Sequence, residues 1–136
     1  MSTLFDKTTA GLATAINMRM MKQNVIQSNI ANAETPGYAA KKMDFEEALA
    51  RALDVDGLRS VGTSHGDHFH VGGGSISKVR PDIYDNPLGQ ISNDGNTVDM
   101  ASEMGSLAEN SIMYKAALQL INKKLASLRY AATEGR

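Results

Sequence analysis

Three histidines and an aspartate fall within six residues of one another, at His65, Asp67, His68 and His70. Imidazole nitrogens and carboxylates are common ligands of Zn²⁺ and other divalent cations, so this group could hold a metal ion. The cluster lies in a glycine-rich stretch, which does not hold metal ligands in a fixed arrangement. No second cluster of ligands elsewhere in the sequence completes a site. A polar loop in which histidine is tolerated explains the same residues, and metal binding is the weaker alternative.

Other chemistry finds less support in the sequence. The run Gly72-Gly73-Gly74 lacks the Gly-x-x-x-x-Gly-Lys-Ser/Thr pattern that binds phosphates, and no Gly-x-Ser-x-Gly nucleophile turn occurs. The chain has no cysteine, which excludes disulfides, thiolate metal sites and cysteine catalysis. Asp and Glu residues are scattered at spacings typical of a solvated helix surface. We therefore expect no enzyme activity and no cofactor.

Length and composition indicate a small protein with a thin core. The chain has 136 residues, which favours one domain, and its net charge of −1 argues against a nucleic-acid-binding protein. Aromatic residues make up 5% and Trp is absent, so apolar area must come mainly from Ala, Leu, Ile and Met. No apolar run is long enough to span a membrane, and no cleavable secretory signal is expected because Lys7, Arg19 and Lys22 interrupt the first segment.

Residues 99–131 are predicted to form a long helix, followed by a tail at 132–136. Positions spaced alternately by four and three are apolar in eight of nine cases, which is the a/d pattern of a coiled coil over about four heptads. These positions, which we name the C-terminal seam, are Met100, Met104, Leu107, Ser111, Tyr114, Leu118, Ile121, Leu125 and Leu128. Asp99 stands where an N-cap belongs, and acidic residues precede the late Lys123, Lys124 and Arg129, which suits the helix dipole.

A second helix is predicted over residues 1–33, in one structural domain with the C-terminal helix. Its apolar stripe contains Phe5, Leu12, Ile16, Ile26 and Ile30, with Leu4 and Ala15 beside them. Arg19 and Gln23 interrupt the stripe: either their aliphatic stems cover it while the polar heads reach water, or they set the register between packed helices. Because one amphipathic stripe cannot bury itself, we expect the two helices to pack together and to leave room for helices of other subunits.

The middle of the chain, residues 34–98, holds all three prolines and nine of the twelve glycines and is predicted to be irregular. A short helix is expected over 44–53, because Asp44 and Glu47 form a capping-box pair ahead of an apolar side. A flexible loop is expected over 54–78. Short β segments are expected near Ser75–Val79, Asp82–Tyr84 and Gln90–Ser92. The run Asn93-Asp94-Gly95-Asn96 is a strong turn signal.

The first helix is followed by the run Asn29-Ile30-Ala31-Asn32-Ala33-Glu34-Thr35-Pro36-Gly37-Tyr38. On physical grounds this run ends a helix, because Pro36 cannot continue one and Gly37 permits a turn. The side-chain amides of Asn29 and Asn32 can bond the backbone groups that the helix end leaves free. Tyr38 then supplies an aromatic anchor.

This run closely resembles the Asn-Ile-Ala-Asn-x-x-Thr-Pro-Gly-Tyr signature of the flagellar basal-body rod and hook axial protein family. The matching positions are Asn29, Ile30, Ala31, Asn32, Thr35, Pro36, Gly37 and Tyr38. Met43-Asp44-Phe45, the run Asp94–Met100 and the stretch from Glu103 to Leu120 resemble the FlgB (proximal rod) type within that family. The resemblance covers both ends of the chain and is weak over 54–90.

The resemblance implies a structural subunit that is mainly α, with long terminal helices pairing as a coiled coil and an irregular middle containing short β segments. It implies self-assembly with other rod proteins, the membrane (MS) ring and its rod adaptor as partners, and transmission of torque to the distal rod and hook. It also implies export by the flagellar type III apparatus, without a cleavable signal peptide, into a rod that crosses the periplasm. We expect no nucleic-acid partner and no direct membrane insertion. Two alternatives stay open: a small metal-binding protein using the histidine cluster, and a generic coiled-coil adaptor.

Overall fold

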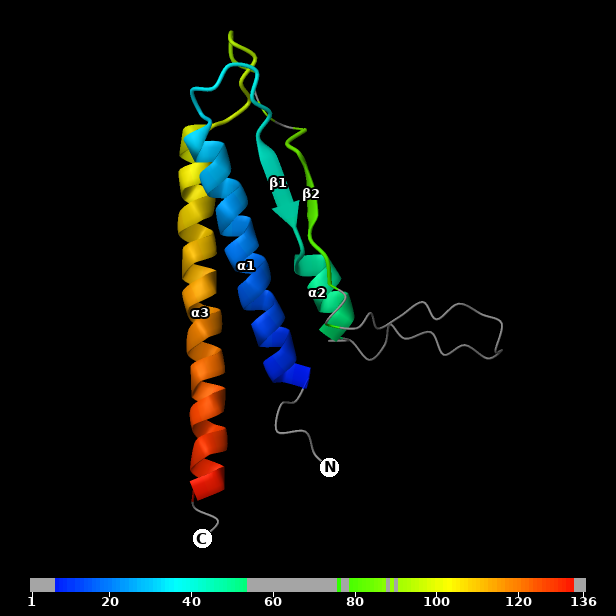
Figure 1. Ribbon diagram of the computed structural model, residues 1–136, viewed down its shortest axis with the longest axis vertical. Helices are drawn as coiled ribbons and strands as arrows, with labels where there is room; N and C mark the ends of the chain where they lie inside the picture. The colour runs from blue at the N-terminus through cyan, green and yellow to red at the C-terminus, as the bar shows by residue number, and fades with distance from the viewer. Residues whose placement is uncertain (1–6, 54–75, 77–78, 88, 90, 134–136) are drawn as a thin grey trace, which may run out of the picture.

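The fold is a pair of long helices flanked on one side by a small sheet and a short helix (Figure 1). The computed structural model describes residues 7–53, 76, 79–87, 89 and 91–133. In chain order the elements are α1 (Lys7–Ala31), β1 (Lys41–Asp44), α2 (Glu46–Leu53), β2 (Asp82–Asp85) and α3 (Met100–Thr133). The most extensive contact joins α1 to α3, and β1 lies against α1. The predicted fold class, mainly α with paired terminal helices and short β segments, is confirmed.

The two long helices differ in length. With 25 residues in α1 and 34 in α3, they measure about 37 and 51 Å at 1.5 Å per residue. The beginning of α3 lies beside the end of α1, so α3 runs past the first described turn of α1 at its far end (Figure 1). Within the described part of the chain, no helix is apolar enough over a sufficient length to cross a membrane.

Local sequence explains where α3 begins. The Asp99 carboxylate accepts hydrogen bonds from the backbone N–H groups of Ala101 (3.0 Å) and Ser102 (3.3 Å). These N–H groups belong to the first turn and have no partner within the helix, which is why an Asp at the N-cap stabilises a helix start. Asp99 is therefore the N-cap that its position in the sequence indicates.

The two strands form an antiparallel sheet in which Lys41 pairs with Asp85 and Asp44 with Asp82. Strand β2 coincides with the β segment predicted at Asp82–Tyr84, but β1 was not predicted. The segment predicted at Gln90–Ser92 is wrong in its described part, because Ile91 and Ser92 belong to no strand. Ser92 closes a turn instead: its N–H donates to the Asn96 carbonyl (2.8 Å), and its own carbonyl accepts from the Gly95 N–H (2.9 Å).

Helix α2 begins at Glu46 rather than at 44, because Asp44 is the last residue of β1 and accepts a hydrogen bond from the Tyr84 hydroxyl instead of capping the helix. The loop predicted over 54–78 and the β segment at Ser75–Val79 lie outside the described residues, apart from Ile76 and Val79, neither of which is in a strand.

The buried apolar side chains gather where α1 meets the sheet and α2. Met43 and Phe45 are each 2% exposed, and Ala52 and Ile26 are also buried. A Cβ added at Gly11 would lie 2.5 Å from the Leu53 side chain, so the glycine allows α1 and α2 to approach closely. This core positions α1, whose other side carries α3.

Candidate functional site

The helix exit after α1 is organised by Asn29, whose side chain is fully buried at 0% exposure. Its amide nitrogen donates to the Lys41 carbonyl (2.8 Å), and its amide oxygen accepts from the Lys41 N–H (3.0 Å). The same oxygen accepts from the Tyr38 hydroxyl at 3.2 Å. The Asn29 side-chain amide thus bonds the backbone of Lys41 as a neighbouring strand would, and it holds the start of β1 against α1.

Asn96, 3% exposed, performs the complementary task at the end of α1. Its side-chain nitrogen lies within 2.8–2.9 Å of three carbonyl oxygens, those of Asn32, Ala33 and Thr35. Its side-chain oxygen accepts from the Val98 N–H at 2.7 Å. These three carbonyls belong to the turn that follows α1, which ends at Ala31, so Asn96 ties that turn to the segment that leads into α3.

Backbone contacts complete this region. The Gly37 N–H donates to the Asp94 carbonyl (2.9 Å), and the Thr97 N–H donates to the Tyr38 carbonyl (3.1 Å). Gly37 and Gly95 both have positive φ, at 71° and 80°, and a Cβ on Gly95 would lie 3.5 Å from the Gly37 Cα. Residues 28–41 and 92–99, which are far apart in the sequence, therefore form one unit. We name it the junction, and it fixes the end of α1 beside the beginning of α3.

The remaining motif positions support the junction from its surface. The Asn32 side chain donates to the Ser28 carbonyl (2.8 Å) and accepts from the Thr35 hydroxyl (3.2 Å). Ile30 and Tyr38 are half-buried, whereas Ala31, Pro36 and Gly37 are exposed. The sequence predicts a helix exit at these positions but carries no local signal for their contact with Asn96.

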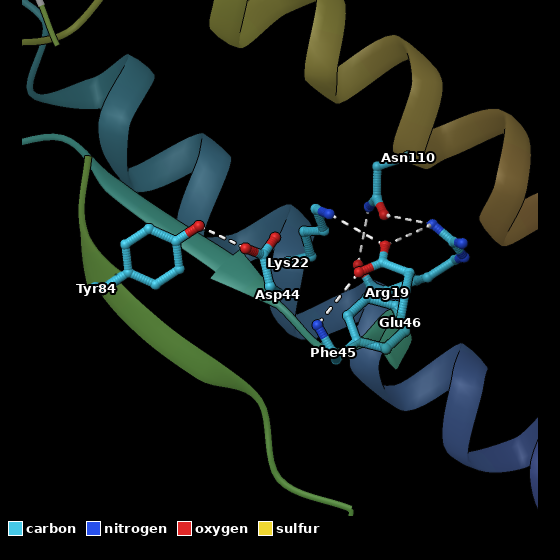
Figure 2. A network of polar contacts seen from close by, with 7 residues as sticks. All are labelled: Arg19, Lys22, Asp44, Phe45, Glu46, Tyr84 and Asn110. Atoms are coloured by element: carbon cyan, nitrogen blue, oxygen red, sulfur yellow. Dashed lines mark hydrogen bonds and ion pairs between the residues drawn. The ribbon is translucent and has the colours of Figure 1, made fainter. Parts of the chain in front are cut away.

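A polar cluster ties α1, α2 and α3 together lower down the helix pair (Figure 2). Asn110, 2% exposed, donates to the Arg19 carbonyl (2.9 Å) and accepts from the Arg19 guanidinium (3.4 Å). The guanidinium also lies 4.0 Å from the Glu46 carboxylate, and Lys22 bonds the same carboxylate at 3.1 Å. Both cations lie over the Phe45 ring, 5.5 and 5.7 Å from its centre. Arg19 therefore does more than cover an apolar stripe, because its head contacts the facing helix.

Two ionisable groups beside this cluster have shifted pKa values. Partial burial acts to raise the pKa of Glu46, but the backbone N–H groups of Phe45 and Glu46 and the Lys22 ammonium stabilise the carboxylate and lower it. The hydrogen bond to Asp44 raises the pKa of the Tyr84 hydroxyl. Neither shift brings a group toward neutral pH, so both fit structural contacts.

The C-terminal seam is only partly used within the chain. The buried residues of α3 are Glu103, Asn110 and Ala117, which repeat every seven residues. They stand one position before Met104, Ser111 and Leu118 of the seam, and one position turns about 100° around a helix. Six residues of the C-terminal seam are half-buried, between the face of α3 that packs on α1 and the exposed face. They are Leu107, Ser111, Tyr114, Leu118, Ile121 and Leu128.

Three residues of the C-terminal seam stay exposed: Met100 (45%), Met104 (53%) and Leu125 (41%). On α1, Ile26 is buried, and Leu12, Ile16 and Ile30 are half-buried, whereas Phe5 and Leu4 lie outside the described residues. Sequence reasoning missed the actual packing face of α3 because polar and small residues, Glu103, Asn110 and Ala117, occupy its centre. The apolar periodicity points to the neighbouring face instead.

The histidine cluster at His65, Asp67, His68 and His70 lies outside the described residues. In the parts of the chain that the structure does describe, no group of three or more His, Cys, Asp or Glu side chains is placed to hold a metal ion. The site that the geometry presents is therefore the junction together with the apolar surface of α3.

Comparison with known proteins agrees with this geometry. The model of the flagella basal body rod protein family matches residues 12–38, which span most of α1 and the motif of the junction. The flagellar basal body rod protein FlgB of Cereibacter sphaeroides is 40% identical over 119 residues, covering 88% of each chain. The chain belongs to the FlgB family of flagellar basal body rod proteins. FlgB of Aeromonas hydrophila is 35% identical over 130 residues and 94% of each chain, and FlgB of Salmonella typhimurium is 35% identical over 118 residues and 84% of each.

Family membership decides between the functions that the sequence left open. The protein is a structural subunit of the flagellar basal-body rod, is located in the basal body, and assembles with other rod components. Rod proteins are structural rather than enzymatic, so neither a metal-binding protein nor a generic coiled-coil adaptor is favoured.

Proposed function

We propose that this subunit belongs to the proximal rod, where it assembles with itself and with other rod proteins through the C-terminal seam. In this position it transmits torque from the MS ring and its rod adaptor to the distal rod and hook. The chain reaches the rod, which crosses the periplasm, through the flagellar type III export apparatus. The sequence resemblance to the FlgB type of proximal rod protein supports this position.

The observation that carries the proposal is the apolar surface of α3. Besides the exposed seam residues, Ile112 is 68% and Leu120 56% exposed, on other sides of the same helix. A surface helix normally has one apolar stripe, and a helix that is apolar on several sides is normally enclosed. Helix α1 covers one side of α3, and β1 and α2 lie on the far side of α1, so we expect neighbouring subunits to cover the rest of the α3 surface.

The junction fixes how α3, with its apolar surface, is oriented relative to α1. Its hydrogen bonds hold the end of α1 to the beginning of α3, and the polar cluster around Asn110 ties the same helices further along. The helix pair can therefore act as one rigid unit, which a part that carries torque requires.

Complementation tests the proposal. In a strain that lacks the gene, the intact chain should restore swimming and complete basal bodies, and the protein should co-purify with them. Basal bodies isolated without this protein should end at the MS ring and lack the distal rod and hook. Complete rods in the deletion strain would contradict a proximal position.

A further inference from the structure

Charges are segregated along α3 and the segment before it. From residue 81 to 114 the sequence contains six acidic residues and no Lys or Arg, whereas residues 110–133 contain four basic residues and no Asp or Glu. The acidic residues are Asp82, Asp85, Asp94, Asp99, Glu103 and Glu109, and the basic residues are Lys115, Lys123, Lys124 and Arg129. One end of the long helix is therefore acidic and the other basic.

The helix dipole accounts for only a small part of this pattern. Its effect falls off within the first and last turns of a helix. The first turn of α3 contains one acidic residue, Glu103, and its last turn contains no basic residue. Glu109 and Lys115 lie well inside the helix, so another cause is needed for the segregation.

Helix α1 does not neutralise the basic half of α3 either. Residues 7–31 contain no Asp or Glu, so α1 offers no carboxylate to Lys123 or Arg129 of α3. The two charged ends also lie far apart, because the junction and the beginning of α3 are at one end of the molecule and the last turns of α3 are at the other (Figure 1).

Each end combines its charge with exposed apolar side chains. The acidic end comprises Glu34, Asp94 and Asp99, all exposed, next to Ile91 (77% exposed) and Met100 (45%). The basic end comprises Lys123 and Arg129, both exposed, next to Leu125 (41%). The two ends of one chain are thus complementary in charge and alike in apolar character.

We infer that the basic end of α3 in one subunit docks on the acidic end of a second copy of this chain. This inference rests on the proposed function, because it specifies one of the contacts through which the subunit assembles. A contact between different ends of identical chains is heterologous, so it leaves a free end of each kind and propagates in one direction instead of closing into a dimer. The charge pattern therefore sets the polarity of assembly, and wrong end-to-end contacts bring like charges together.

Disulfide trapping reads this contact directly, because the chain has no native cysteine. Asn93→Cys places a thiol at the acidic end and Ser127→Cys places one at the basic end. When the two variants are mixed and oxidised, we expect mixed dimers in excess of the statistical mixture, and fewer of them as salt rises from about 0.05 to 0.5 M, because screening weakens contacts between exposed charges. A statistical mixture, or a yield independent of salt, would overturn the inference.

Charge exchange provides the second arm. Glu34→Lys with Asp94→Asn and Asp99→Asn makes the acidic end positive while the Asn side chains keep the turn and N-cap hydrogen bonds. Lys123→Glu with Arg129→Glu makes the basic end negative. We expect each set alone to lower mixed-dimer yield roughly tenfold and the two sets combined in one chain to restore self-association. A combined variant no better than either set would refute head-to-tail docking, and circular dichroism of each variant checks that it folds.

The two proposals fail separately. If head-to-tail docking is wrong, the charge variants enter basal bodies normally while apolar-to-Asp variants of the C-terminal seam do not. If the proposed function is wrong, neither set of variants affects basal bodies, and the deletion strain forms complete rods.

Discussion

The side chain of Asn29 in α1 bonds both backbone groups of Lys41 in β1. Its nitrogen donates to the Lys41 carbonyl at 2.8 Å, and its oxygen accepts from the Lys41 N–H at 3.0 Å. No other residue type offers a donor and an acceptor in this planar arrangement except Gln, which is one methylene longer. The chain that leaves the helix at Pro36 is therefore returned to α1 at a defined residue.

Asn29→Asp should destabilise the fold although it changes a single group. The carboxylate keeps the acceptor but removes the donor, which leaves the Lys41 carbonyl without that partner in a buried place. We expect a loss of about 1–3 kcal/mol in the free energy of unfolding, measured by urea denaturation. Asn24→Asp, on the exposed face of α1, is the matched control and should be nearly neutral. Equal effects of the two substitutions would contradict the role given to Asn29.

Asn96→Ala should release the turn that follows α1. It removes the donor to three carbonyls and the acceptor for the Val98 N–H, at a site that is 3% exposed. We expect a cost of about 1–3 kcal/mol and faster amide hydrogen exchange in the last turn of α1. Asn93→Ala, in the same turn but exposed, should change neither quantity. Unchanged exchange in Asn96→Ala would show that other contacts hold this helix end.

Two Gly→Ala substitutions should have opposite effects. Gly37 has φ +71°, which a residue with a Cβ adopts only under strain, so Gly37→Ala should cost about 1 kcal/mol. Gly105 lies within α3 with nothing within 4 Å of an added Cβ, so Gly105→Ala should stabilise by about 0.5–1 kcal/mol. Thermal unfolding of the two variants beside the parent protein measures both changes, and equal signs would be inconsistent with the backbone described.

How much of this structure could be predicted from the sequence varies with the kind of signal. Asp99 and the four-three spacing of apolar residues predict α3, because capping and periodicity are local. Strand β1 has the sequence Lys-Lys-Met-Asp, which lacks alternation, and it exists because Asn29 and β2 bond its backbone. Such a strand depends on contacts between distant residues, which a pattern of single residues does not contain.

The candidate site shows the same division. The motif from Asn29 to Tyr38 could be read as a helix exit, and the run around Asn96 as a turn. Their contact joins residues more than sixty positions apart, such as Asn96 and Asn32 (separation 64), and could not be read from either run alone. Likewise, Asn110 on the packed face of α3 is satisfied by Arg19, and hydrophobic periodicity gives no signal for a polar pair.

Acid should unfold the protein partly through Glu46. Its pKa is lowered in the folded state, so its contribution to stability is present above the ordinary value of 4.5 and is lost as the pH falls through the lower folded value. Glu46→Gln should therefore lower stability at neutral pH and make it less dependent on pH on the acid side. Because the side chain is 49% exposed, the difference should shrink in high salt. Parallel acid-unfolding curves for parent and variant would contradict this account.

The most direct test of the central claim, that the exposed part of the C-terminal seam makes subunit contacts, is the amount of variant protein in purified basal bodies. Met104→Asp with Leu125→Asp places two charges on the exposed seam, whereas Ser102→Asp with Gln119→Asp places two charges at exposed polar positions of the same helix. Both variants should fold and be exported. We predict that the seam variant is absent from basal bodies and does not swim, while the control behaves as the parent. Normal incorporation of the seam variant would contradict the account.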